Sequence, residues 1–325
     1  GKSETYRDRG LSFKAFSIDF GNFTLGFEDS YIYLDKTFDA ESFLSPIPMF
    51  LYEMVLGTPG RPWTQANNTN AIMGFFGEWE NDYLYLESQL LVDDSNASIL
   101  APILGKAIPS LNSISNLQKL AWGIGGHLDT PSGTFGFYHS GATKYTFEAT
   151  YVSVDNYSTV PYEYTYYPAT EYEDFYGSMQ TIRYQENYIG YKYGENNVAF
   201  LFDYTGIAFS QSLWSFDLYS SLEWVINGAK SPANPWHEYD SWLEIEPRYE
   251  LLSDPVLEHQ LLASMSADKK RGNFDFGLDV SFGYVWNRLR LEELVAGEPK
   301  IYVPRDGDNG VLFSVSLFIR YGVEL

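Results

Sequence analysis

The sequence contains no cysteine, no long apolar run and few basic residues. The absence of cysteine excludes disulfide bonds and fits an exported protein that does not rely on them. No stretch approaches the roughly eighteen apolar residues of a membrane-spanning helix, which excludes a helical membrane protein. Lys and Arg number 21 against 43 Asp and Glu, for a formal net charge of -22. This acidic excess argues against a nucleic-acid partner, because Lys and Arg bind phosphates.

Aromatic residues, by contrast, are abundant. They make up 18% of the 325 residues, with 27 Tyr, 23 Phe and 8 Trp. Such a fraction is high for a soluble enzyme, and length alone would also allow two soluble domains. It suits an outer-membrane β-barrel, which places aromatic side chains at both lipid interfaces.

The clearest pattern lies in segment 310–325. From Asn309 the chain reads NGVLFSVSLFIRYGVEL, with an apolar side chain at every second position from Val311 to Leu325. Side chains of a strand alternate between two faces, so one face is apolar and the other, which includes Arg320, is largely polar. A strand of this kind is typical of bacterial outer-membrane barrels, whose outer face contacts lipid and whose inner face lines the lumen.

The same alternation recurs along the chain and predicts an antiparallel transmembrane β-barrel. A soluble β-sandwich would show a similar period, but long strands with Tyr or Trp near their ends favour the barrel. We expect one domain over residues 1–325, with about 14–18 strands; an even number is usual for closed bacterial barrels. The expected strands are 11–20, 22–34, 48–56, 71–79, 82–92, 120–129, 134–140, 143–153, 158–167, 185–194, 197–209, 211–226, 238–250, 255–267, 272–288 and 310–325.

Connection lengths predict the orientation. If the last strand ends in the periplasm, counting backwards places the longest connections outside the cell, as in known barrels. These connections are 57–70, 93–119, 168–184 and 289–309. Two connections, 35–47 and 227–237, do not fit, because they are long on the inner side. Segment 93–119 has apolar residues at loose helical spacing and two prolines, so we expect a partly helical loop that folds over or into the lumen.

The tyrosine-rich region 157–193 is the candidate ligand site. Sugars pack their C–H faces on aromatic rings and bond their hydroxyls to carboxylates, and this region supplies both groups on the predicted outer side. An aromatic girdle with strand ends above the membrane would account for the same tyrosines. The residues assigned to ligand binding, with one tryptophan from another loop, are Trp63, Tyr162, Tyr164, Tyr166, Tyr167, Glu171, Tyr172 and Asp174.

The polar faces of the predicted strands would line the lumen. Most of the charged residues there are acidic, so an open pore would favour cations. In a plugged barrel these carboxylates would pair with internal basic residues such as Arg183, Lys192 and Arg320. The residues assigned to the lumen lining are Asp203, Asp217, Glu223, Asp275, Asp279 and Arg320.

No catalytic site is expected. Outer-membrane hydrolases place His beside Ser at the barrel rim. His139 and Ser140 are sequence neighbours, but adjacent residues of a strand point to opposite faces and cannot form a dyad with each other. Asp93 with Asp94, and the acidic run at 171–174, have oxygen ligands suited to calcium. We nevertheless assign no metal site and no cofactor.

Several stretches, taken in order, resemble the capsule assembly proteins of the Wzi type. The resemblance covers about residues 15–206. It implies a large antiparallel outer-membrane barrel that is closed by its own loops. It also implies a lectin-like role in attaching or organising surface polysaccharide. The stretches are FGNFTLGFEDSYIYLD, ESFLSPIPMFLYEMV, GFFGEWE, LYLESQLLVDD, EYTYYP and YIGYKYGENNVAFLFDYTG.

The sequence therefore predicts a non-enzymatic outer-membrane barrel that binds or organises surface (capsular) polysaccharide. Two alternatives remain: a porin-like channel for small cationic or neutral solutes, and a barrel scaffold subunit of a larger envelope complex. The expected location is the bacterial outer membrane. The expected partners are the lipid bilayer and lipopolysaccharide, with surface polysaccharide and other envelope proteins as further candidates and no nucleic acid.

Overall fold

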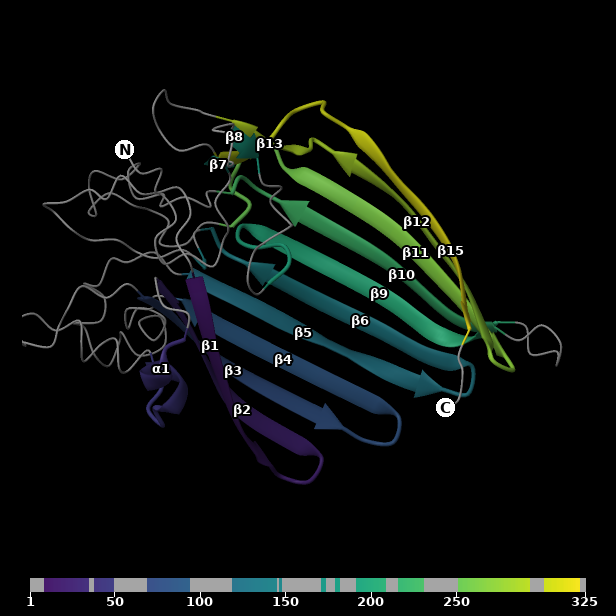
Figure 1. Cartoon of the computed structure of the whole chain (residues 1–325), viewed down its shortest axis with the longest axis horizontal. Helices are drawn as coiled ribbons and strands as arrows, with labels where there is room; N and C mark the ends of the chain where they lie inside the picture. Colours follow the sequence, from purple (N-terminus) through teal and green to yellow (C-terminus); the bar gives the residue numbers. More distant parts are fainter. Residues whose placement is uncertain are drawn as a thin grey trace, which may run out of the picture.

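The computed structural model contains one large antiparallel β-sheet (Figure 1). Its eleven strands follow the order β1-β2-β3-β4-β5-β6-β9-β10-β11-β12-β15. The predicted all-β antiparallel fold is confirmed. The structure describes residues 9–34, 38–49, 69–93, 119–144, 146–147, 171–173, 179–181, 191–208, 216–230, 251–292 and 301–321.

The strands of the sheet are long, with 10 to 14 residues each. Their bounds are β1 (Arg9–Asp19), β2 (Phe23–Leu34), β3 (Thr69–Glu80), β4 (Leu84–Asp93), β5 (Lys119–Thr130), β6 (Gly133–Ala142), β9 (Asn197–Ala208), β10 (Phe216–Asn227), β11 (Glu258–Arg271), β12 (Phe274–Trp286) and β15 (Gly310–Tyr321).

Among the described residues, four short strands and one short helix lie outside this sheet. Strands β7 (Glu171–Glu173) and β8 (Met179–Thr181) form one hairpin, and β13 (Leu289–Glu292) and β14 (Ile301–Pro304) form another. Helix α1 spans Ala40–Leu44. In the part of the chain that the structure describes, no helix has the length and apolar character needed to cross a bilayer.

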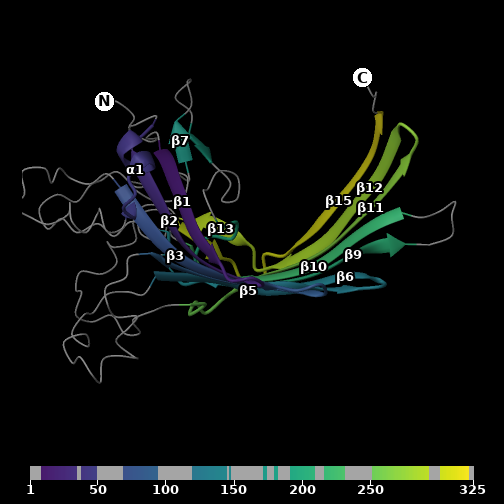
Figure 2. The ribbon, with the colours of Figure 1, turned by 90° about the horizontal axis from the view of Figure 1, so that it is seen from below.

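The sheet curves into an arc with a convex and a concave face (Figure 2). Strands β1 and β15 are the two rims of the arc, and in the described residues neither has a neighbour on its outer side. The sheet is therefore open here, and its eleven strands are fewer than the expected number. Because every pair of neighbours is antiparallel, the first and last of eleven strands run in the same direction.

All long connections lie at one end of the sheet, the loop end, and all short ones at the other, the turn end (Figure 1). The loop-end connections are 35–68, 94–118, 143–196, 228–257 and 287–309. The turn-end connections are 20–22, 81–83, 131–132, 209–215 and 272–273. The two predicted exceptions, 35–47 and 227–237, are thus parts of loop-end connections. The structure therefore separates long from short connections at the two ends of the sheet without the two exceptions that the sequence predicted.

The exceptions arose because some predicted strands do not belong to the sheet. Residues 143–147, where described, form turns rather than the start of a strand at 143–153. Residues 191–194 are also a turn, and Met49 is not in a strand, although strands were expected at 185–194 and 48–56. Since β2 pairs directly with β3 and β6 with β9, no segment inserts between them.

Other predicted elements cannot be compared with the structure. The expected strands at 158–167 and 238–250 lie outside the described residues. So does the expected partly helical loop, since residues 94–118 are not described and the two ends of segment 93–119 belong to β4 and β5.

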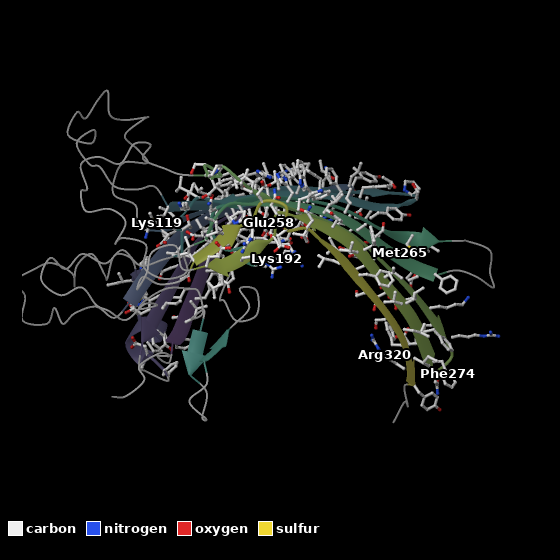
Figure 3. The ribbon with its side chains drawn as sticks, turned by 90° about the horizontal axis from the view of Figure 1, so that it is seen from above. Lys119, Lys192, Glu258, Met265, Phe274 and Arg320 are labelled. Carbon is white, nitrogen blue, oxygen red and sulfur yellow. The ribbon has the colours of Figure 1, made fainter. Side chains whose placement is uncertain are left out.

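The strand register places most of the large apolar residues of the sheet on one face, although Leu11, Phe13 and Ile72 lie on the other. Phe27 pairs with Phe16 on β1 and with Phe75 on β3, and Phe282 pairs with Phe313 on β15. Polar residues pair on the other face, as Asp279 does with Ser316. Arg320 and Lys192 project into the arch (Figure 3), so the polar face is the concave one and the apolar face is convex.

The convex face leaves a continuous apolar surface uncovered. Leu317 is 75% exposed, Phe313 67% and Phe202 52%. Soluble monomers rarely expose contiguous apolar patches larger than a few hundred Å². Exposed large apolar residues of this face include Phe16, Ile18, Leu25, Phe75, Leu86, Leu90, Ile124, Leu128, Phe135, Phe137, Leu222, Trp224, Leu261, Met265, Phe276, Val311, Val315 and Ile319.

A diagonal row of rings crosses the convex face near the loop end. The ring of His139 stacks on Phe200 (centroids 4.6 Å apart), Phe200 on Trp224 (5.6 Å), and Trp224 on His259 (6.2 Å). Trp122 adjoins His139 at the other end of the row (6.2 Å). Rows of aromatic rings near one end of the strands are typical of the interface girdles of membrane barrels.

The imidazole of His139 has both ring nitrogens paired despite its apolar surroundings. The indole N–H of Trp122 donates to Nε2 at 3.1 Å, so Nε2 must be the unprotonated nitrogen. Nδ1 then carries the proton and donates to the carbonyl of Ala199, also at 3.1 Å. A neutral imidazole with both nitrogens satisfied costs little in an apolar medium.

Aromatic rings lie across glycines on the neighbouring strand. On the concave face, a Cβ added to Gly125 would overlap the ring of Tyr138, and one added to Gly26 would overlap Phe76. By contrast, a Cβ added to Gly123, on the same strand and face as Gly125, would meet nothing within 4 Å. Gly125 therefore has a packing role that Gly123 lacks, because only glycine lets the tyrosine ring lie flat on the sheet.

This difference predicts that the same substitution affects the free energy of unfolding much more at Gly125 than at Gly123. Gly125→Val should lower the free energy of unfolding by about 1–3 kcal/mol, because the new side chain displaces Tyr138. Gly123→Val should stay within about 0.5 kcal/mol of the wild type or be slightly stabilising, since valine favours strands. Urea unfolding followed by tryptophan fluorescence measures both. Equal destabilisation of the two variants would contradict the assigned packing.

Candidate functional site

The concave face carries most of the charged residues of the sheet, and most of these are acidic. All of the residues predicted to line a lumen point to this face by register. The carboxylates of this face are Asp19, Glu28, Glu78, Glu80, Glu87, Asp93, Asp129, Asp203, Asp217, Glu223, Glu258, Asp268, Asp275 and Asp279. Among residues with described side chains, its basic groups are Lys119, His127, Lys270 and Arg320.

Several of the predicted lumen residues have partners. Arg320 lies 3.8 Å from Asp275, and the hydroxyl of Ser266 donates to Asp279 at 2.6 Å. Lys192, from the connection that precedes β9, donates to Glu223. Lys192 thus pairs with a carboxylate of this face, whereas Arg183 lies outside the described residues.

Tyrosines and carboxylates alternate across the middle of the concave face. The hydroxyl of Tyr85 donates to Glu87 at 2.9 Å, and the ring of Tyr85 stacks on His127 with centroids 5.1 Å apart. The ring of Tyr138 lies over Gly125, which separates it from Glu87 on β4. On its other side, β6 pairs with β9, which carries Asp203. We call Tyr85, Glu87, Tyr138 and Asp203, together with Tyr219 and Glu223 on β10, the tyrosine–carboxylate band.

A cavity of about 360 Å³ opens on the concave face toward the loop end. Its floor comes from β1 to β6, and the side chains of Phe147 and Tyr191 contribute from two connections. We call it the apolar cavity, because most of its lining is apolar. The lining side chains of this face are Leu11, Phe13, Glu28, Ser30, Ile72, Gln89, Leu91, Ala121, Ser140, Phe147 and Tyr191.

A second cavity of about 300 Å³, the acidic hollow, adjoins the first toward the turn end. Glu28, Gln89 and Gly123 line both cavities. Glu78 and Glu87 line only the hollow. The two cavities together change from apolar to acidic along the strand direction.

Glu28 lies at the junction of the two cavities. Its side chain is only 6% exposed, and the amide of Gln89 donates a hydrogen bond to Oε1. It lies across Gly74, its partner on β3, where any Cβ would overlap the carboxylate. A buried carboxylate needs hydrogen bonds or an opposite charge, and Gln89 supplies one such bond.

Connections from the loop end cover one side of the apolar cavity. The hydroxyl of Tyr191 is 2.9 Å from the Ser140 hydroxyl and donates to Asn197 at 2.8 Å. The backbone N–H of Phe147 donates to the buried carboxylate of Asp93 at 2.8 Å. These bonds fix both rings over the concave face, so the cavity wall at the loop end is ordered.

A buried lysine holds further connections together at the loop end. The amine of Lys230 is 1% exposed and donates to the carbonyls of Tyr193 and Glu195. Burial lowers the pKa of Lys230 to about 7, although the carboxylates of Glu195, Glu258 and Asp254 favour its charged form. The amine donates to backbone carbonyls in either protonation state, so the clamp persists on both sides of neutral pH.

The β13–β14 hairpin is attached at the loop end through charged groups. Arg288 and Arg290 both donate to the carboxylate of Asp308, and Leu289 donates its N–H to Glu258 at 2.7 Å. The hydrogen bond from Arg290, followed by that from Arg288, lowers the pKa of Asp308 to about 2. The carboxylate is therefore ionised at any pH above this value.

Most of the residues predicted to bind ligand lie outside the described residues. Glu171 and Tyr172 form part of β7, but their side chains are not described. Trp63, Tyr162, Tyr164, Tyr166, Tyr167 and Asp174 lie outside the described residues.

The sequence interpretation did not identify Tyr85, Tyr138 and Tyr219 as site residues. A signal was present: each occupies the polar phase of its strand, as in LYLES, where Tyr85 and Glu87 share a face. A tyrosine in phase with carboxylates faces away from the apolar surface.

The structure also bears on the catalytic and metal alternatives. His139 is on the convex face and Ser140 on the concave face, as predicted from their adjacency. Within the described ranges, no group of three or more His, Cys, Asp or Glu is placed to hold a metal ion.

The Asp308 ion pairs predict acid sensitivity in a defined window. Because the folded-state pKa is lowered, the stabilisation is fully present above about pH 4, the ordinary pKa of Asp, and is lost as pH falls toward 2. The melting temperatures of wild type and Asp308→Asn should therefore differ by a constant amount above pH 4 and converge near pH 2. Asp306→Asn, on the same turn, is the control and should show no such convergence. A difference that persists at pH 2 would exclude this origin.

Comparisons with known protein families, with curated proteins and with solved structures found no match to this chain.

Proposed function

We propose that the chain is a bacterial outer-membrane β-barrel protein, with the convex face in contact with lipid and the concave face toward the lumen. The observation that carries this proposal is the continuous exposed apolar surface, in phase over eleven strands. Lipid-facing strands need about 9–11 tilted residues, and these strands have 10 to 14. The ring row from Trp122 to His259 fits one interface girdle.

We further propose that the arc closes in the membrane. An open sheet edge in hydrocarbon would leave backbone N–H and C=O groups unpaired, at several kcal/mol each. Because β1 and β15 run in the same direction, closure requires either parallel pairing of these strands or an odd number of additional strands between them. The expected barrel of 14–18 strands remains a prediction in this respect.

The favoured function is non-enzymatic binding of surface polysaccharide on the concave side. The tyrosine–carboxylate band supports it, because sugars use both aromatic faces and carboxylate acceptors. The resemblance to capsule assembly proteins of the Wzi type points the same way. The excess of carboxylates favours neutral or cationic glycans over anionic ones, because like charges repel at short range.

A porin-like channel for small cationic or neutral solutes is the second candidate. The acidic concave face favours it, since carboxylates in a pore select cations. The connections of Phe147, Tyr191 and Lys230, which pack over the loop end of the concave face, favour binding over free conduction.

The membrane assignment predicts a difference between two adjacent positions of β10. Leu222, 44% exposed on the convex face, should not tolerate arginine: Leu222→Arg should lower the unfolding free energy in lipid vesicles by about 2–4 kcal/mol. Ser221→Arg, on the concave face opposite Asp203, should cost much less. Urea titration of vesicle-embedded protein, read by heat-modifiable gel mobility, measures both.

The opposite results would contradict the membrane assignment. In a water-soluble protein, arginine at a half-exposed position has little effect, so Leu222→Arg would match Ser221→Arg. Purified chain that stays monodisperse in buffer without detergent would contradict it as well.

The ligand assignment predicts a role for the ring of Tyr138. On an array of neutral and anionic oligosaccharides, we expect binding to neutral glycans, weakened about three- to tenfold by Tyr138→Ala, because one ring contact contributes about 0.5–1.5 kcal/mol. Tyr138→Phe should retain most of the binding. Tyr83→Ala, 67% exposed on a turn, is the matched control and should have no effect.

Two outcomes would favour other functions. Unchanged binding by Tyr138→Ala would remove the band from the glycan site. Cation-selective conductance in planar bilayers, with no glycan binding, would favour the channel.

A further inference from the structure

The apolar cavity and the acidic hollow form a continuous site of two chemistries. The apolar part is lined by side chains from six strands and two connections. The acidic part begins at Glu28, which lines both cavities, and continues to Glu78 and Glu87. No sugar-binding role explains the apolar part, because polysaccharides offer no large apolar group to fill it.

The volume and lining suit a small organic ligand. About 360 Å³ is at the lower end of the range for small-molecule sites, which runs from roughly 300 to 1,000 Å³. Such sites combine apolar walls with a few polar groups that fix orientation. Here Leu11, Ile72, Leu91 and Ala121 supply the walls, and Glu28 supplies the polar group at one end.

The charge of the site selects the polar end of the ligand. Among the described residues that line either cavity, there is no Lys, Arg or His. Gln89 donates one hydrogen bond to Glu28, and Tyr85 donates one to Glu87, but neither donor carries a charge. A carboxylate-bearing ligand would be repelled, whereas an ammonium group would be attracted by all of the carboxylates at once.

We propose that these adjoining cavities bind a small amphipathic cation, whose apolar body occupies the apolar cavity and whose amine lies beside Glu28. This site shares Glu87 with the tyrosine–carboxylate band but does not include Tyr138 or Tyr219, and it goes beyond the proposed polysaccharide role. Phe147 and Tyr191 form its wall at the loop end. The amine would lie toward the acidic hollow and the turn end.

The test uses 4-phenylbutylamine as the probe, with 4-phenylbutanol and 4-phenylbutyrate as matched molecules of other charge. Binding to the full chain in lipid nanodiscs is measured by calorimetry and by ligand-observed NMR, with empty nanodiscs subtracted. We expect the amine to bind at least fivefold more tightly than the alcohol and the acid to bind most weakly. If the chain proves soluble without lipid, the same titration is run in buffer, so failure of the membrane assignment does not decide this one.

Two variants separate the apolar and the acidic contributions. Gly123→Val places a side chain where both cavities meet, at a position where an added Cβ meets nothing within 4 Å, and should weaken amine and alcohol alike by at least fivefold. Glu28→Gln should remove the preference for amine over alcohol and keep alcohol binding. The controls, Ser314→Val and Asp268→Asn, lie on the same face outside both cavities and should bind like the wild type.

Several results would overturn the proposal. Equal affinity for the three probes would remove the role of the carboxylates. Unchanged amine binding by Gly123→Val would place the ligand elsewhere. Uptake no greater than that of empty nanodiscs would show that the cavity holds water rather than an organic ligand.

Discussion

The rest of this structure depends on one uncovered surface. Side chains of a strand alternate between faces, and in this sheet all eleven strands contribute exposed apolar side chains to the convex side. Water would disfavour that surface by about 25 cal/mol for each Å² of apolar area, whereas hydrocarbon would not. Hydrocarbon in turn requires that polar groups be paired. The antiparallel ladder pairs the backbone, and His139 pairs both of its ring nitrogens. Only the rims, β1 and β15, lack neighbours among the described residues.

The two ends of the sheet differ in what they do to the concave face. Short turns leave the turn end open, whereas parts of two loop-end connections, at Phe147 and Tyr191, pack against the concave face. The segment of Met49 packs on the convex face, where its N–H bonds to Asp29. The amine of Lys230 bonds to backbone carbonyls, Asp93 accepts the N–H of Phe147, and Glu258 accepts the N–H of Leu289. These are bonds to backbone from buried side chains, which hold the position of a connection more firmly than surface ion pairs do. Any ligand of the concave face therefore meets ordered walls at the loop end.

The candidate site was only partly predictable from the sequence. Period-two alternation assigned Asp203, Glu223 and Asp279 to the polar face, and the structure places them there. Tyr138 could have been assigned in the same way, because it is out of phase with the apolar residues of its strand. The apolar cavity could not, since its walls combine β1 to β6 with Phe147 from a connection. Residues so far apart in sequence meet only through strand pairing, which no local pattern encodes.

The sequence by itself determined the all-β type of fold, the face of most sheet residues and the positions of the eleven sheet strands to within a few residues. Segments 272–288 and 310–325 show why: alternation is a property of each strand alone, so it is readable before any pairing is known. Tertiary structure decided which alternating segments join the sheet. Residues 143–147, where described, and 191–194 form turns over the concave face, although they continue a period of two. Membership of a sheet depends on hydrogen bonds to a partner strand, and those bonds are made between residues that are distant in the chain.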